Sequence, residues 1–171
     1  VMGKSQKKVS YALATQFIQK DKCWVGPATF AKGWVGSNST PSTFKMRATL
    51  EVEGLTIEGC FVEVSYKRSP SGLAKDTFSA SFFIDNARIV GVDDGKPSTH
   101  TNKVGQGLEF FEQTIPHPHL HIPIEPASYG YAIPLEPMSI SDLWQLFLKE
   151  AGIRLAPDFT MPPEEQGSLL L

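Results

Sequence analysis

Apolar and polar residues alternate along the middle of the chain, and this period of two predicts β-strands. Over residues 44–53 the alternation is strict, which is typical of a strand with one face in the core and the other in water. The pattern also predicts strands over residues 55–66, 77–84 and 87–92. The short connections between these strands favour an antiparallel meander.

Prolines gather in the last third of the chain, where nine of the thirteen lie between Pro116 and Pro163. Proline has no N–H to donate to a neighbouring strand, so strands in this part should be short or at an edge. The best candidates are residues 117–124 and 129–135. Together with the meander they predict an antiparallel sheet of about five or six strands.

Two segments show apolar residues at helical spacing, residues 9–20 and residues 139–152. Ser139 is a suitable N-cap for the second segment, and Gly152 is a suitable residue for its C-terminal turn. The sequence therefore predicts an α+β fold, with an N-terminal helix and a C-terminal helix packed on the sheet.

The composition fits one folded domain. The chain has 171 residues, of which 41% are hydrophobic and 20% charged, and this is enough to form a core. We expect a single domain over residues 1–156 and a weakly ordered tail over residues 157–171. Two cysteines, Cys23 and Cys60, do not make a disulfide framework. With no apolar run long enough to cross a bilayer and no signal peptide, the sequence predicts a cytoplasmic protein without a membrane partner.

Charge is unevenly distributed, although the net charge is only −2. Residues 1–40 hold six lysines and one acid, Asp21, and form a basic N-terminal lobe. Such a lobe suits phosphate, as in a nucleotide or a nucleic acid. The alternative is an ordinary solvated surface. The low net charge excludes wholesale coating of nucleic acid.

Three of the four histidines alternate in one short segment, as His117, His119 and His121. On a strand these side chains project from one face. Imidazole binds zinc and other divalent transition metals, and His119-x-His121 followed by Glu125 matches the core of the first cupin motif. The sequence thus offers a metal site of His117, His119, His121 and Glu125. A cupin needs a further histidine on a later strand, and none follows. His100 or Asp93 could complete the site from the loop, although nothing in the spacing requires either.

Metal-free acid–base chemistry is a second hypothesis for the same histidines. Two imidazoles, one neutral and one charged, can move protons in phosphodiester transfer. His119 and His121 would then be the acid and base. Asp93, Asp94 or Glu125 would orient an imidazole, and Lys96 or Arg88 would stabilise negative charge. A third interpretation is a wet edge strand whose histidines have no chemical role.

The second half of the chain resembles a family of small bacterial and prophage-associated proteins known as a domain of unknown function. The resemblance covers residues 82–153 and rests on the His100-Thr101-Asn102 loop and the Pro118-His119-Leu120-His121 strand. It implies that His100 and Asn102 act together with His119 and His121, but it implies no reaction.

Three functions follow as expectations. The first is a phosphodiester-directed hydrolase, nuclease-like and related to toxins or defence, with His119, His121 and His100 as catalytic residues. Asn102, Asp93 and Lys96 would bind its substrate. The second is a cupin-like metal-binding protein, with zinc as the first metal to consider. The third is a phage- or defence-related binding module without catalysis. The sequence does not define the oligomeric state.

Overall fold

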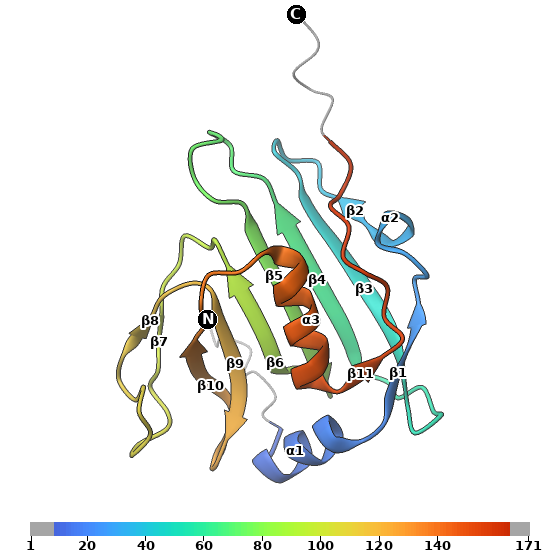
Figure 1. Ribbon diagram of the computed structural model, residues 1–171. Coiled ribbons are helices and arrows are strands. Elements are labelled where there is room, and N and C mark those ends of the chain that lie inside the picture. Colours follow the sequence, from blue (N-terminus) through green and yellow to red (C-terminus); the bar gives the residue numbers. More distant parts are fainter. Residues whose placement is uncertain (1–8, 165–171) are drawn as a thin grey trace, which may run out of the picture.

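The protein is mostly β in a computed structural model that describes residues 9–164 (Figure 1). The helices of this part are α1 (Tyr11–Gln19), α2 (Phe30–Gly33) and α3 (Ile140–Ala151). The strands are β1 (Lys22–Gly26), β2 (Val35–Gly36), β3 (Thr43–Val52), β4 (Phe61–Lys67), β5 (Thr77–Ile84), β6 (Ala87–Asp94), β7 (His100–Thr101), β8 (Thr114–Ile115), β9 (His119–Ile124), β10 (Ala127–Pro134) and β11 (Ile153–Arg154).

Nine of these strands form one sheet, which curls around α3 (Figure 1). Its order is β10-β9-β6-β5-β4-β3-β1-β11, and β2 pairs with β3. Every pair is antiparallel except β1 with β11, which is parallel. Strands β7 and β8 form a separate two-stranded sheet within the long connection from β6 to β9.

The pairing register gives the sheet two chemically different faces. Along β5, Phe78, Ala80 and Phe82 are fully buried and belong to the hydrophobic core, which α3 covers from the side seen in Figure 1. The residues between them point to the opposite face. There Ser79 pairs with Asp93 across β5 and β6. The candidate site lies on this second face.

Helix α3 begins and ends as its sequence predicts. The Ser139 hydroxyl accepts a hydrogen bond from the Asp142 N–H, which satisfies a backbone donor of the first turn. Gly152 ends the helix at a φ of 70°, a left-handed conformation that glycine adopts without strain. The buried stripe of α3 contains Leu143, Trp144 and Phe147.

A buried lysine that follows helix α1 binds the carbonyl groups at the C-terminal end of the helix. Lys22 is the first residue of β1, and its Nζ donates to the carbonyls of Phe17 at 2.5 Å, Ile18 at 2.7 Å and Lys20 at 2.8 Å. The ammonium group thus satisfies carbonyl groups that have no partner within the helix. Burial lowers the pKa of Lys22 to about 8.

The segment after β11, described to residue 164, runs back along the sheet. Its Phe159 ring packs on Phe30 and on Phe78. The carbonyls of Pro157 and Thr160 accept hydrogen bonds from the indoles of Trp144 and Trp34, respectively. Residues 157–164 of the expected tail therefore contact the core in this structure. Residues 165–171 lie outside the described part.

The predicted fold class is wrong. The protein has a nine-stranded mixed sheet with three short helices in its described part, where the sequence predicted an α+β fold with an antiparallel sheet of five or six strands. The prediction missed β1 because this five-residue strand ends at Gly26-Pro27, the first of several Gly and Pro residues that are typical of a loop. It missed β11 because two residues give no pattern, and without these strands there was no parallel pair to expect.

No described helix has the length and apolar character needed to cross a membrane.

Candidate metal centre

Strands β6 and β9 lie side by side and bring one carboxylate and two imidazoles together. The register pairs Asp93 with His119, and Gly91 with His121. These residues alternate with core residues such as Val92. The carboxylate and both imidazoles therefore lie on the face opposite α3.

The three side chains form a compact buried group. Oδ2 of Asp93 lies 3.1 Å from Nε2 of His121 and 3.4 Å from Nε2 of His119. Exposure is 4% for the Asp93 side chain, 2% for His119 and 6% for His121. Ligands 2.0–2.1 Å from a tetrahedral zinc ion lie about 3.3 Å apart, so these separations suit three ligands of one metal. The group could hold a metal ion.

Two cations also bind Asp93. The guanidinium of Arg88 donates from Nη2 to Oδ1 at 2.9 Å and from Nη1 to Oδ2 at 3.1 Å. Lys96 Nζ lies 3.1 Å from Oδ1, and the Ser79 hydroxyl donates to the same oxygen at 2.8 Å. These contacts fix the direction of the carboxylate, as outer partners of a metal ligand do.

The path of the Arg88 side chain to Asp93 passes over Gly91. A Cβ on Gly91 would overlap the guanidinium of Arg88. With only hydrogen at this position, the arginine side chain lies along β6 from residue 88 to Asp93. The structure thus assigns Gly91 a steric function.

The surroundings lower the pKa of both Asp93 and His121. Burial favours the neutral form of Asp93, but the neighbouring imidazoles of His119 and His121 and the charge of Arg88 outweigh it and hold the pKa of that carboxyl far below its usual value. Burial lowers the pKa of His121 to about 4, against the hydrogen bond with Asp93, which raises it. Near neutral pH, Asp93 is therefore ionised and His121 is neutral.

The hydrogen bonds of His119 identify which ring nitrogen carries a proton. Nδ1 lies 3.2 Å from the carbonyl oxygen of Pro116, and a carbonyl only accepts, so Nδ1 carries the hydrogen. In neutral His119, Nε2 then directs a lone pair at Oδ2 of Asp93. Two facing lone pairs repel, so this tautomer suits a cation bound between the two atoms.

Two polar atoms of this region are buried without a hydrogen-bond partner among the described residues. They are Nε of Arg88 and Nδ1 of His121. Buried polar atoms are rarely left unpaired in native proteins, and those that are found often bind water or a ligand.

His100 and Asn102 lie beside the group but bind the edge of β10. His100 Nε2 lies 3.1 Å from the Gly130 carbonyl, and the Asn102 amide both donates to and accepts from the backbone of Ala132, at 2.8 Å each. The two side chains thus substitute for a neighbouring strand. Asn102 is fully buried and His100 contacts the His121 ring edge-on, with 4.7 Å between centroids.

The structure brings together only part of the predicted metal set. His119 and His121 belong to the group, and Asp93 joins them. The sequence offered Asp93 both to complete the metal site and to bind substrate. The His117 ring stacks on His119 at 4.5 Å, just before β9 begins, and burial lowers the pKa of His117. Glu125 is exposed in the turn between β9 and β10, outside the group.

Sequence reasoning also missed one residue of the site. Ser79 lies within β5 as a small polar residue between Phe78 and Ala80. In that position a serine is compatible with any wet strand face. Only the pairing of β5 with β6 shows that its partner is Asp93.

Only part of the basic N-terminal lobe, residues 9–40, lies within the described residues. Lys4, Lys7 and Lys8 lie outside the described residues. Lys22 is fully buried against α1, so it offers no charge to a partner. Lys32 is exposed. Phosphate binding by this lobe stays a prediction.

Comparisons with family models, with curated proteins and with solved structures give no match. The resemblance to the bacterial and prophage-associated family stays a prediction.

Proposed function

We propose that Asp93, His119 and His121 bind one divalent transition metal, with zinc as the first candidate, and that the protein is a metal-dependent hydrolase of phosphate esters. The observation that supports it most is the meeting of Nε2 of both histidines with one carboxylate oxygen in a buried place. Three protein ligands leave a coordination position for water or substrate, as in catalytic zinc sites.

A bound divalent metal supplies an acidic water and polarises a phosphoryl oxygen. The chain contributes orientation and charge. Arg88 and Ser79 hold the carboxylate of Asp93 in place. Lys96, whose side chain is one-third exposed, provides a positive charge that an anionic substrate can approach.

A test of metal binding uses untagged protein that was not purified on an immobilised-metal column. We expect about one zinc per chain by elemental analysis. His119→Gln and His121→Gln should lose it, and His117→Gln, which changes a neighbouring histidine outside the group, should keep it. Equal metal content in all four proteins would contradict the proposed ligands.

A test of the reaction uses bis(p-nitrophenyl) phosphate, which releases a coloured product on hydrolysis. The zinc-loaded protein should release it, and both the His121→Gln variant and the chelator-treated protein should not. A zinc-loaded protein without activity on this diester and on its monoester would remove the hydrolase function and leave a metal-binding protein.

Metal-free acid–base catalysis is the second candidate, because Arg88 and Lys96 already compensate the charge of Asp93. On that hypothesis His119 and His121 move protons beside the carboxylate of Asp93. Activity that survives removal of metal and disappears in His119→Gln would support it.

A further inference from the structure

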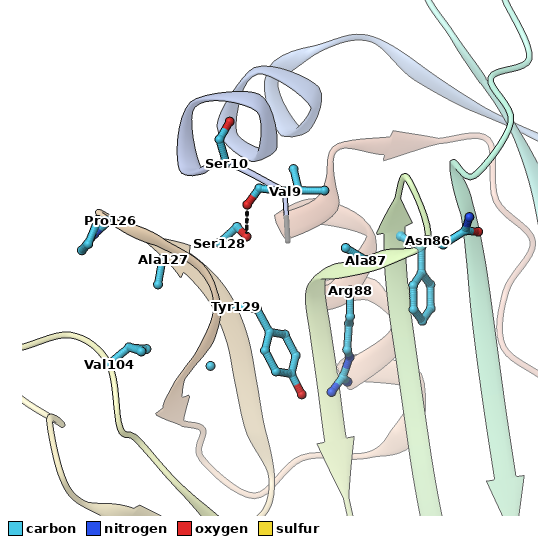
Figure 2. A pocket seen from close by; sticks show the side chains of 12 residues that line it. Val9, Ser10, Asn86, Ala87, Arg88, Val104, Pro126, Ala127, Ser128 and Tyr129 are labelled. Carbon is cyan, nitrogen blue, oxygen red and sulfur yellow. Dashed lines mark hydrogen bonds between the residues drawn. The ribbon is translucent and has the colours of Figure 1, made fainter. Parts of the chain in front are cut away.

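A groove of about 830 Å³ opens between the start of α1, the β5–β6 turn and β10 (Figure 2). This volume is in the range of small-molecule sites. Arg88 and Tyr129 line the groove and also connect it to the candidate centre. Arg88 binds Asp93, and the Tyr129 ring lies parallel to the ring of His121, with 6.2 Å between centroids.

The lining suits an anion with an apolar part. Among the described residues that line the groove, Arg88 is the one charged side chain, and apolar groups such as Phe83 and Val104 contribute much of the wall. The Tyr129 ring is 47% exposed and offers a surface for a planar group. Arg88 extends from the groove wall to Asp93, whose single charge also pairs with that of Lys96, so positive charge is in excess in this cluster.

Two buried atoms beside Asp93 have no hydrogen-bond partner among the described residues: Nε of Arg88, a residue that also lines the groove, and Nδ1 of His121. Nε of Arg88 carries a hydrogen and can only donate. When Nε2 of His121 binds a metal, Nδ1 carries a hydrogen and is also a donor. Both atoms then need an acceptor, and the oxygens of an anion provide one.

We propose that this groove binds the organic part of the substrate, an aromatic anion whose charged group lies toward Arg88 and the Asp93–His119–His121 group. The inference rests on the proposed function, because it makes the groove the substrate site of that centre. A phosphate ester and a carboxylate both satisfy the geometry, and the experiment separates them.

Calorimetric titration of the full chain tests the groove, with phenyl phosphate, benzoate and phenol as probes and the metal content of each sample measured. We expect phenyl phosphate to bind more tightly than phenol. Val104→Glu places a negative charge in the wall and should weaken phenyl phosphate binding about tenfold or more, through repulsion at close range. Val104→Gln, of equal size and neutral, should bind nearly as the unaltered protein does. Leu108→Glu, exposed and outside the lining, is the charge control.

The outcomes separate the two proposals. The groove would not be the binding site if neither anion bound, or if Val104→Glu and Leu108→Glu weakened anion binding equally. This conclusion would hold even where zinc is bound. Anion binding that is sensitive to Val104→Glu in a protein without metal would support the groove and contradict the metal centre. Tight benzoate binding without phenyl phosphate binding would support an anion groove and contradict phosphate-ester hydrolysis.

Discussion

Asp93 is the residue on which the site depends. Its two oxygens accept from Arg88, Ser79 and Lys96 and lie next to two imidazoles. The alternation of three histidines predicted the His119–His121 pair correctly as neighbours, because strand geometry fixes i and i+2 on one face. The sequence had no means of choosing the third partner, since the pairing of β6 with β9 joins residues 26 positions apart.

Removing the Asp93 charge should destabilise the protein. Asp93→Asn leaves Arg88 and Lys96 without their carboxylate in a buried place, and breaking a buried pair in this way costs roughly 3–5 kcal/mol. Urea unfolding measures the change. Asp21→Asn, which removes the exposed pair with Arg154, should leave the free energy of unfolding nearly unchanged. Equal effects of both variants would show that the Asp93 cluster contributes little.

Stability of the metal-free protein should fall in acid. The pKa of His121 is about 4 in the folded protein, against about 6.5 in an unfolded chain. Between these values the unfolded chain binds more protons, so stability is fully present above pH 6.5 and is lost as the pH falls through about 4. Thermal unfolding from pH 7.5 to 4.5 in chelator shows it. His121→Gln should have a flatter profile, and an unchanged profile would contradict the assignment.

A side chain at Gly91 should move Arg88 away from the site. Gly91→Ala displaces the Arg88 guanidinium from Asp93, so we expect a lower Tm and weaker zinc binding. Gly26→Ala is the matched control, because a Cβ there meets nothing within 4 Å. Zinc affinity and Tm equal to those of the unaltered protein would show that Arg88 finds another path.

At the scale of elements, the small β7–β8 sheet and the residue after β7 cover the free edge of β10. Side chains of His100 and Asn102 bind backbone groups of Gly130 and Ala132, which would otherwise be an open strand edge. The family resemblance grouped His100 and Asn102 with the histidine strand. The structure places them beside it through these backbone contacts, which neither motif nor spacing reveals.

Loss of the Asn102 amide should loosen this edge. Asn102→Ala removes the partners of Ala132 N–H and of two carbonyls, those of Phe110 and Ala132. We expect a loss of roughly 2–4 kcal/mol in unfolding free energy and faster hydrogen exchange at the Ala132 amide. Asn38→Ala, at an exposed position, is the control. Unchanged exchange at Ala132 would contradict a sealing function.

For the whole molecule, sequence patterns located most elements but not the architecture. The alternation over 44–53 and the caps of α3 are local signals, and β3 and α3 appear where these signals place them. Extension of the sheet by β1 and β11 depends on a buried lysine and on a two-residue strand. Both are tertiary effects, because Lys22 is buried only where the end of α1 provides carbonyl acceptors.

The central claim, a metal held by Asp93, His119 and His121, is tested most directly by X-ray absorption at the zinc edge of the loaded protein. We predict two imidazole ligands and oxygen ligands, each about 2.0–2.1 Å from zinc. His119→Gln should leave no bound zinc to give this spectrum, and His117→Gln should leave both imidazoles. A spectrum without imidazole, or one that His119→Gln does not change, would contradict the account.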